Sequence, residues 1–197
     1  MSFPVGEDGA ANRREMEVVV VSAQALSEAD RRTVAGWAAD CAERVLPLFE
    51  AEAPDDDRPR DAIARARAFS RGELRAADEI RRRFVAGRAA NAVSSPAAVA
   101  AARAAAQASG VAHMGAHALG AAAYAAKAAG LGVPERTEAV DDEVAWQLLH
   151  MTAATREALR RLPLLGEDPA GPLGPGLLAS GVLATVIREI QADLAAR

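Results

Sequence analysis

The sequence predicts an all-α protein, a compact alanine-rich bundle of about six to seven helices with at most one short N-terminal strand. Alanine supplies roughly a quarter of the 197 residues and has the highest intrinsic helix propensity. Apolar side chains recur at intervals of three and four residues along most of the chain. Aromatic residues make up only 4% of the sequence, so the helices are expected to cohere through many close contacts between small side chains.

The first strong helix is expected over residues 27–52. Ser27, with Asp30 three residues later, is typical of a helix start, because a serine oxygen can accept from a free backbone N–H. Pro47 has no N–H to give to a helix interior, so a kink or a tightening is expected near the end. Cys41, the single cysteine, is expected to be a buried small hydrophobe. The apolar stripe consists of Val34, Trp37, Ala38, Cys41, Val45, Leu48 and Phe49.

Helix-start and helix-stop signals divide the middle of the chain into four further helices. The acidic run 55–57, followed by Pro59, favours a helix start, Gly72 an interruption, and Ser95-Pro96 another start. The helices are expected over residues 59–71, 73–91, 96–109 and 112–129. Small residues on every side of the last of these predict a central helix, which ends at the glycine- and proline-containing stretch 130–134.

The helical domain is expected over residues 16–162, and its last helix is expected over residues 141–161. A Gly/Pro-rich linker is then predicted over 163–176, and a C-terminal helix over 177–197 that docks on the domain or on a partner. At the other end, residues 1–15 are expected to form a disordered tail, and the valine run within 17–22 is the one strand-like segment.

Charge and hydropathy exclude several classes of function. A formal charge of −4 and a pI near 5.5 argue against a nucleic-acid partner, which a basic face would recognise. No run approaches the ~18 consecutive apolar residues that span a bilayer, so no membrane partner is expected. Residues 1–14 lack the apolar core of a signal peptide, and a cytoplasmic location is therefore expected.

His113 and His117 are the sharpest chemical signal. Their i, i+4 spacing would place two imidazoles on one face of a helix, which is how a helix supplies two metal ligands. A zinc-like site needs a third ligand, for which Asp40 or Glu43 is the candidate. The alternative is a polar pair that is hydrogen-bonded to neighbouring helices, with no cofactor. Two charged runs also have alternatives: residues 55–57 as cation ligands or a solvated turn, and 81–83 as an anion site or a solvent face with a salt bridge.

Three stretches give the chain a family resemblance. They read WAADCAERVLPLFE (37–50), DDRPR (56–60) and HMGAHALGAAAYAAKA (113–128). With these stretches the chain resembles the bacterial putative immunity protein family of polymorphic toxin systems, of the immunity-protein-5-like type, over roughly residues 27–130. The resemblance implies an all-α domain that binds and neutralises a cognate protein toxin in the producing cell. It implies no catalytic residues.

Three hypotheses of function follow. The first is an interaction protein that masks a toxin, which suits the acidic charge if the toxin is basic. The second is an enzyme or a metal-dependent protein with one pocket that both motif blocks build. The third is a homo-oligomeric structural module, sealed by the valine run or by the last helix. The candidate pocket residues are Trp37, Asp40, Glu43, Arg58, His113, His117 and Tyr124.

Overall fold

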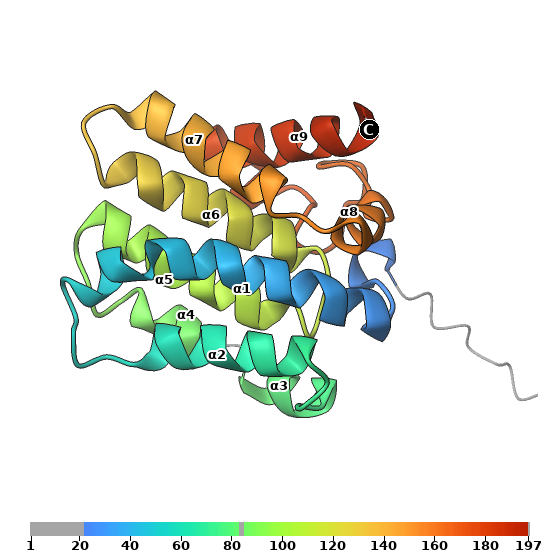
Figure 1. The fold of residues 1–197 in the computed structure, drawn as a ribbon, viewed down its shortest axis with the longest axis horizontal. Helices are drawn as coiled ribbons and strands as arrows, with labels where there is room; N and C mark the ends of the chain where they lie inside the picture. Colours follow the sequence, from blue (N-terminus) through green and yellow to red (C-terminus); the bar gives the residue numbers. More distant parts are fainter. Residues whose placement is uncertain (1–21, 83–84, 197) are drawn as a thin grey trace, which may run out of the picture.

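The computed structural model describes residues 22–82 and 85–196, which form a bundle of α-helices (Figure 1). No strand is present in these two ranges, so the all-α prediction is confirmed for them. The helices are more numerous than the six to seven expected. They are α1 (Glu28–Glu50), α2 (Arg58–Ser70), α3 (Ala76–Arg82), α4 (Val85–Ala89), α5 (Pro96–Gly110), α6 (His117–Leu131), α7 (Arg136–Leu149), α8 (Ala153–Arg160) and α9 (Gly181–Ala196), with 3₁₀ turns η1 (Ala23–Ala25) and η2 (Leu177–Ala179).

Helix α6 lies at the centre of the bundle. It packs against α1 and α5 on one side and against α7 and α9 on the other, while α2, α3 and α4 form the layer beyond α1 and α5 (Figure 1). Eleven of the fifteen residues of α6 are buried, and most of these are alanine or glycine. The buried residues of α5, which makes the most extensive contact with α6, are all alanine or glycine. The predicted central position of this segment is therefore confirmed.

Bulky apolar side chains lie mainly around this core of small residues. Phe49 of α1, Phe69 of α2, and Ile187 and Ile190 of α9 are all fully buried. Large side chains therefore fill the wider spaces near the outer helices, while small ones allow the inner helices to approach one another closely.

The helix starts at Ser27 and Ser95 lie where the sequence places them, and each rests on a local side-chain cap. The Ser27 hydroxyl oxygen accepts from the Asp30 backbone N–H at 3.1 Å and begins α1. Its hydroxyl also donates to the Asp30 carboxylate at 2.8 Å, so the serine binds Asp30 twice. The Ser95 hydroxyl oxygen caps α5 in the same way, accepting from the Ala98 backbone N–H.

The helix predicted over 112–129 is wrong at its start. Residues 111–116 form a turn, and α6 begins at His117 and extends to Leu131. Part of the turn is bound by the N-terminal segment instead of by helical hydrogen bonds. The Gly115 N–H donates to the Ala25 carbonyl and the Ala116 N–H to the Gln24 carbonyl, both at 3.0 Å. A tertiary contact thus replaces a helical turn that alanine propensity favours.

The helix predicted over 141–161 is also wrong, because the structure contains two helices there. Helix α7 starts earlier, at Arg136, and ends at Leu149, and α8 follows it. Thr152 has an extended backbone, and its hydroxyl oxygen accepts from the Thr155 N–H at 3.0 Å to cap the new helix. This break lets α7 pack on α6 while α8 packs on α1 and α9.

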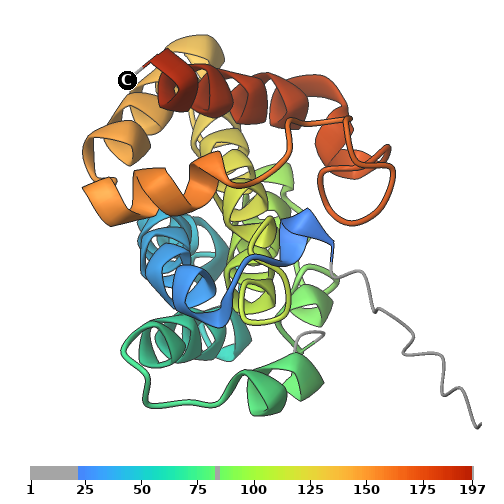
Figure 2. The same ribbon diagram turned by 90° about the vertical axis from the view of Figure 1, so that its right-hand side faces the viewer.

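The side chain of Gln24 holds the predicted linker, residues 163–176, against the bundle. This side chain is fully buried; it donates to the Ala170 carbonyl and accepts from the Leu173 N–H. Leu173 is fully buried, so the stretch is not uniformly exposed. The loop lies beside η1 and the 111–116 turn, and α9 then crosses the top of the bundle and packs on α6 (Figure 2).

Some expectations concern residues outside the described ranges. The disordered tail over 1–15 and nearly all of the strand-like segment 17–22 belong to this group. The helix predicted over 73–91 includes α3 and α4, which flank residues 83–84. No helix in the described part of the chain is long and apolar enough to cross a bilayer.

The alanine core predicts that α6 will not accept larger side chains. Ala125 is fully buried, so Ala125→Leu should lower the free energy of unfolding by about 1–3 kcal/mol through overpacking. Ala64→Leu on the exposed face of α2 is the matched control and should change it by less than about 0.5 kcal/mol. Urea unfolding monitored by circular dichroism measures both. Equal stability of the two variants would show that the core around Ala125 can accommodate a leucine side chain.

Candidate functional site

The structure does not gather the seven predicted pocket residues in one place. Trp37 of α1 is buried, and its indole N–H donates to the Gln147 carbonyl of α7 at 3.0 Å. Tyr124 of α6 is also buried, with its hydroxyl 3.4 Å from Nη1 of Arg103 on α5. Both aromatic side chains therefore connect helices within the bundle.

The charged members of the predicted pocket form ion pairs at the α1–α2 side of the molecule. Arg67 of α2 lies 2.7 Å from the Asp40 carboxylate and 2.6 Å from that of Glu43, and this pairing lowers the pKa of Glu43. Arg58 pairs with the neighbouring Asp56. Asp40 and Glu43 thus bind an arginine, not the two histidines for which they were the expected partners.

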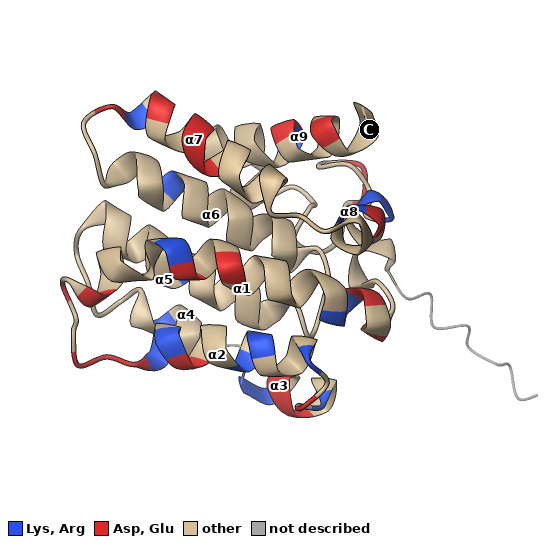
Figure 3. Ribbon diagram, viewed as in Figure 1, with Lys and Arg blue, Asp and Glu red and all other residues tan. Residues whose placement is uncertain are grey.

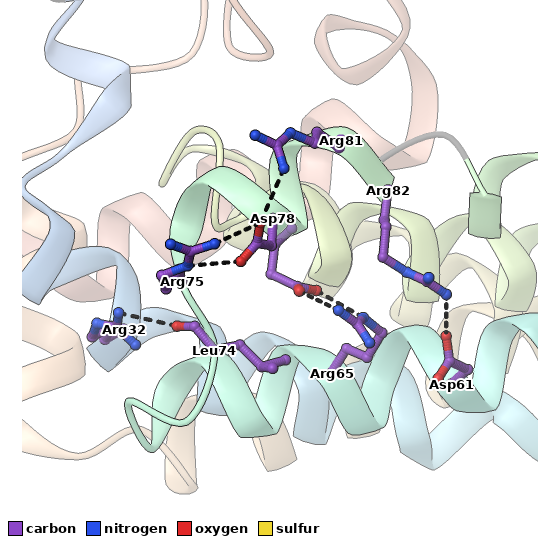
Figure 4. Close-up of polar contacts among 9 residues, drawn as sticks. Arg32, Asp61, Arg65, Leu74, Arg75, Asp78, Arg81 and Arg82 are labelled. Carbon is purple, nitrogen blue, oxygen red and sulfur yellow. Dashed lines mark hydrogen bonds and ion pairs between the residues drawn. The ribbon is translucent and has the colours of Figure 1, made fainter.

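The arginine run at the end of α3 pairs with carboxylates (Figure 4). Arg81 lies 3.2 Å from Asp78, and Arg82 lies 3.3 Å from Asp61 of α2. Both arginines are exposed, which favours the solvent-face interpretation over the anion site for these two residues. Nearby, Arg65 binds Glu79 through two hydrogen bonds. Because Glu79 is nearly buried, this pair ties α3 to α2.

His113 and His117 do line a common hollow, although they do not share a helix. His113 lies exposed in the turn before α6, and His117 is the first residue of that helix. A groove of about 640 Å³ opens between this turn, α4 and α5. Its polar lining consists of Arg88, Asn91, Gln107, His113 and His117.

The His117 imidazole is held neutral in this groove. Its Nδ1 lies 2.8 Å from the Gln107 side-chain oxygen, to which it donates. Burial, with a smaller contribution from nearby His113, lowers the pKa of His117 to about 4. Among the described residues, no three His, Cys, Asp or Glu side chains are arranged to hold a metal ion. The hydrogen-bonded alternative thus describes His117, while His113 faces solvent.

Helix α7 is fixed on the bundle by a polar network on its inner face. Glu143 is only 4% exposed and accepts from Arg44 of α1 at 2.8 Å. The side-chain N–H groups of Gln147 donate to Glu143 and to the Ala122 carbonyl of α6, each at 3.1 Å. Together with the Trp37 bond to the Gln147 carbonyl, these contacts connect α7 to α1 and α6.

Apart from Trp146, the side chains on the outer face of α7 make no such polar contact with the other described helices. Glu138, Asp142, Ala145 and Leu149 are all exposed and follow helical spacing, so they lie along one side of the helix. Asp141 and the half-buried Trp146 flank them. We call these six residues the α7 face. Its acidic half is visible on the ribbon, where α7 carries several carboxylate residues near its start (Figure 3).

Trp146 is packed by charged and aromatic neighbours at the far end of the α7 face. The Arg44 guanidinium lies 4.0 Å from the ring centroid, and the His150 ring stacks on Trp146 with 4.0 Å between centroids. These contacts hold the indole in a fixed position at the surface.

Comparison with models of protein families assigns the chain to a family. The model of the family described as "Imm-5 like putative immunity protein" matches residues 24–154, which is more than half of the sequence. The chain belongs to this family. The resemblance inferred from residues 27–130 is therefore confirmed, and the match extends to the start of α8. No curated protein and no solved structure matches the chain.

The part of the chain that matches the Imm-5 like family contains all of α7, the groove and both histidines, while α9 lies outside it. Sequence reasoning missed Arg88, Asn91 and Gln107, which reach the groove from two other segments. It also missed the α7 face. The signal for that face was present as carboxylates and Leu149 at helical spacing, but the expected helix began only at residue 141.

The environment of His117 predicts a pH dependence of stability. Its pKa is about 4 in the folded protein and about 6.5 in an unfolded chain, so between these values only the unfolded chain takes up the proton. Stability should therefore fall as the pH drops from about 6.5 toward 4, by at most roughly 3 kcal/mol.

His117→Gln should remove most of this slope, whereas His113→Gln, at an exposed position, should keep it. Chemical denaturation of all three proteins across this pH range is the measurement. Identical slopes would show that His117 titrates in the folded state as it does in solvent.

Proposed function

We propose that this member of the Imm-5 like family protects its host cell by binding a cognate basic toxin through the α7 face. The family assignment supports the immunity role. One observation supports α7 as the contact surface. The helix is fixed firmly to the bundle, and its exposed side carries an exposed leucine and carboxylates that form no ion pair within the described chain.

The carboxylates of the α7 face differ from most others on the surface. Elsewhere, acidic residues such as Glu28, Asp56 and Glu73 are bound by a nearby arginine. Within the described chain, the carboxylates of Glu138, Asp141 and Asp142 form no ion pair or hydrogen bond. Such carboxylates attract a basic partner and speed its association, because opposite charges steer the encounter.

The other half of the α7 face offers an apolar anchor. Leu149 is 80% exposed, the largest exposure among the large apolar side chains of the described residues. Of Trp37, Tyr124 and Trp146, only Trp146 reaches the surface. Aromatic side chains held in place at the centre of an apolar patch contribute most to the binding energy of typical interfaces.

The hydrogen bonds of Glu143 and Gln147 hold the α7 face in one conformation before a partner binds. Glu143 and Gln147 fix the helix to α1 and α6, so little conformational entropy remains to be lost when a partner docks. A basic surface around the active site of a toxin, such as that of a nuclease, is the chemistry that this face complements. Covering that surface would block access of the toxin's substrate.

The first test uses the toxin candidates encoded by neighbouring genes. Each is expressed with and without this protein, and the expected result is restored growth together with a co-purifying complex. Absence of both rescue and complex with every candidate would contradict the immunity role for this chain.

The second test locates the surface. Glu138→Lys should weaken binding to the toxin identified in the first test about tenfold at low salt and less at high salt. Leu149→Ala should weaken this binding about tenfold at both salt concentrations. The matched controls are Glu189→Lys and Leu164→Ala, both at exposed positions outside the family match. Calorimetry gives the four dissociation constants. Rescue that survives both α7 variants with unchanged affinity would place the contact elsewhere.

A further inference from the structure

The groove beside the two histidines has a composition that is unusual for this chain. Although the protein has a net charge of −4, no aspartate or glutamate among the described residues lines the groove. A second hollow of about 400 Å³ shares Gln107, His113 and His117 with it and is equally free of carboxylates. These three residues therefore border both hollows.

The polar groups in the groove are mostly hydrogen-bond donors. The side chains of Arg88, Asn91 and His113 form no hydrogen bond or ion pair within the described chain. The side-chain N–H groups of Gln107 also have no partner there, because only its oxygen is bound, by His117. A guanidinium and two amides without competing carboxylates favour an anion that carries several acceptor oxygens.

Two glycines make room for this arrangement. A Cβ on Gly110 would lie 2.9 Å from Cγ and Cδ2 of the His117 ring. A Cβ on Gly120 would lie 2.3 Å from the Gln107 side-chain oxygen. Alanine, the residue this chain uses most in its core, would therefore displace either end of the His117–Gln107 hydrogen bond. The two polar side chains occupy space that the helices leave open for them.

The hydrogen bond also defines the state of the imidazole. The side-chain oxygen of Gln107 only accepts, so Nδ1 of His117 carries the proton and Nε2 is left as an acceptor. Because burial keeps the ring neutral, Nε2 can accept from a hydroxyl or an amine at neutral pH. The groove thus combines donors for an anion with one oriented acceptor.

We propose that this groove binds a small organic anion, with its phosphate or carboxylate group at Arg88 and Asn91 and a hydroxyl or amine of the same molecule at His117. A groove of about 640 Å³ is within the size range of small-molecule sites. This ligand site is separate from the α7 face and does not depend on toxin binding.

The test uses the full chain at neutral pH with four probes. Adenosine 5′-monophosphate, inorganic phosphate and citrate are the anions, and adenosine is the uncharged match of the first. Imidazole ¹⁵N NMR and calorimetry should show that at least one anion shifts the His117 signal and binds with a dissociation constant below about 1 mM, while adenosine does neither. Preference for a phosphate or for citrate identifies the group at Arg88.

Arg88→Gln should weaken this binding at least tenfold, whereas Arg81→Gln, an equal loss of charge at an exposed site, should leave it unchanged. Gly120→Ala is a second variant. It should displace Gln107 and weaken binding while circular dichroism shows a retained helical fold.

Three results would each overturn the proposal: no anion shifts the His117 signal, adenosine binds as well as its monophosphate, or the two arginine variants bind alike. None of these results bears on toxin binding. Conversely, Glu138→Lys should leave anion binding intact.

Discussion

Close contact between α6 and the helices around it is the constraint on which this structure depends. Neighbouring helices can approach a central helix closely on all sides only if its side chains are short, and α6 meets this condition with alanine and glycine at most buried positions. The scarcity of large aromatic residues then follows, because little space remains at the centre. Cohesion comes from many small contacts, each weak alone and substantial together.

Buried polar side chains supply the specificity that uniform alanine surfaces lack. Identical methyl-covered helices could slide or rotate against one another, whereas a buried amide must find particular partners. The side chains of Gln147 and Glu143 fix α7 relative to α6 and α1, and the side chain of Gln24 fixes the loop before η2. The Glu143–Gln147 network also orients the α7 face, and the His117–Gln107 hydrogen bond connects α6 to α5 beside the groove.

The two proposed sites lie on opposite kinds of surface within the family match. The α7 face is acidic and partly apolar, which suits a protein partner. The groove is concave and free of carboxylates, which suits a small anion. Their separation gives the family fold room for an interaction surface and a ligand site without either constraining the other.

Local signals made much of the fold predictable. The caps at Ser27 and Ser95 and the stop after Leu131 are encoded by neighbouring residues, and they lie where the sequence indicates. The turn at 111–116 was not predictable, because segments far away in the chain supply its hydrogen-bond partners. The break at Thr152 gave only a weak signal, since a threonine can also lie within a helix.

The site was less accessible to sequence reasoning than the fold. His113 and His117 were correctly linked to one another, but for a reason that fails, since they do not share a helix. The groove residues Arg88 and Gln107 come from other segments, and only tertiary packing brings them to the same hollow as the histidines. By contrast, Trp37 and Tyr124, which stand in the stretches that carry the family resemblance, connect helices, and a motif alone does not separate such a role from ligand binding.

Native-state hydrogen exchange tests the central claim most directly. If contact on all sides of α6 organises the protein, the amides of α6 should exchange most slowly, through global unfolding, while those of α3 and α4 should exchange faster through local opening. Exchange from α6 at the rates found in α3 would contradict the account, because a helix that opens on its own cannot be what the others depend on.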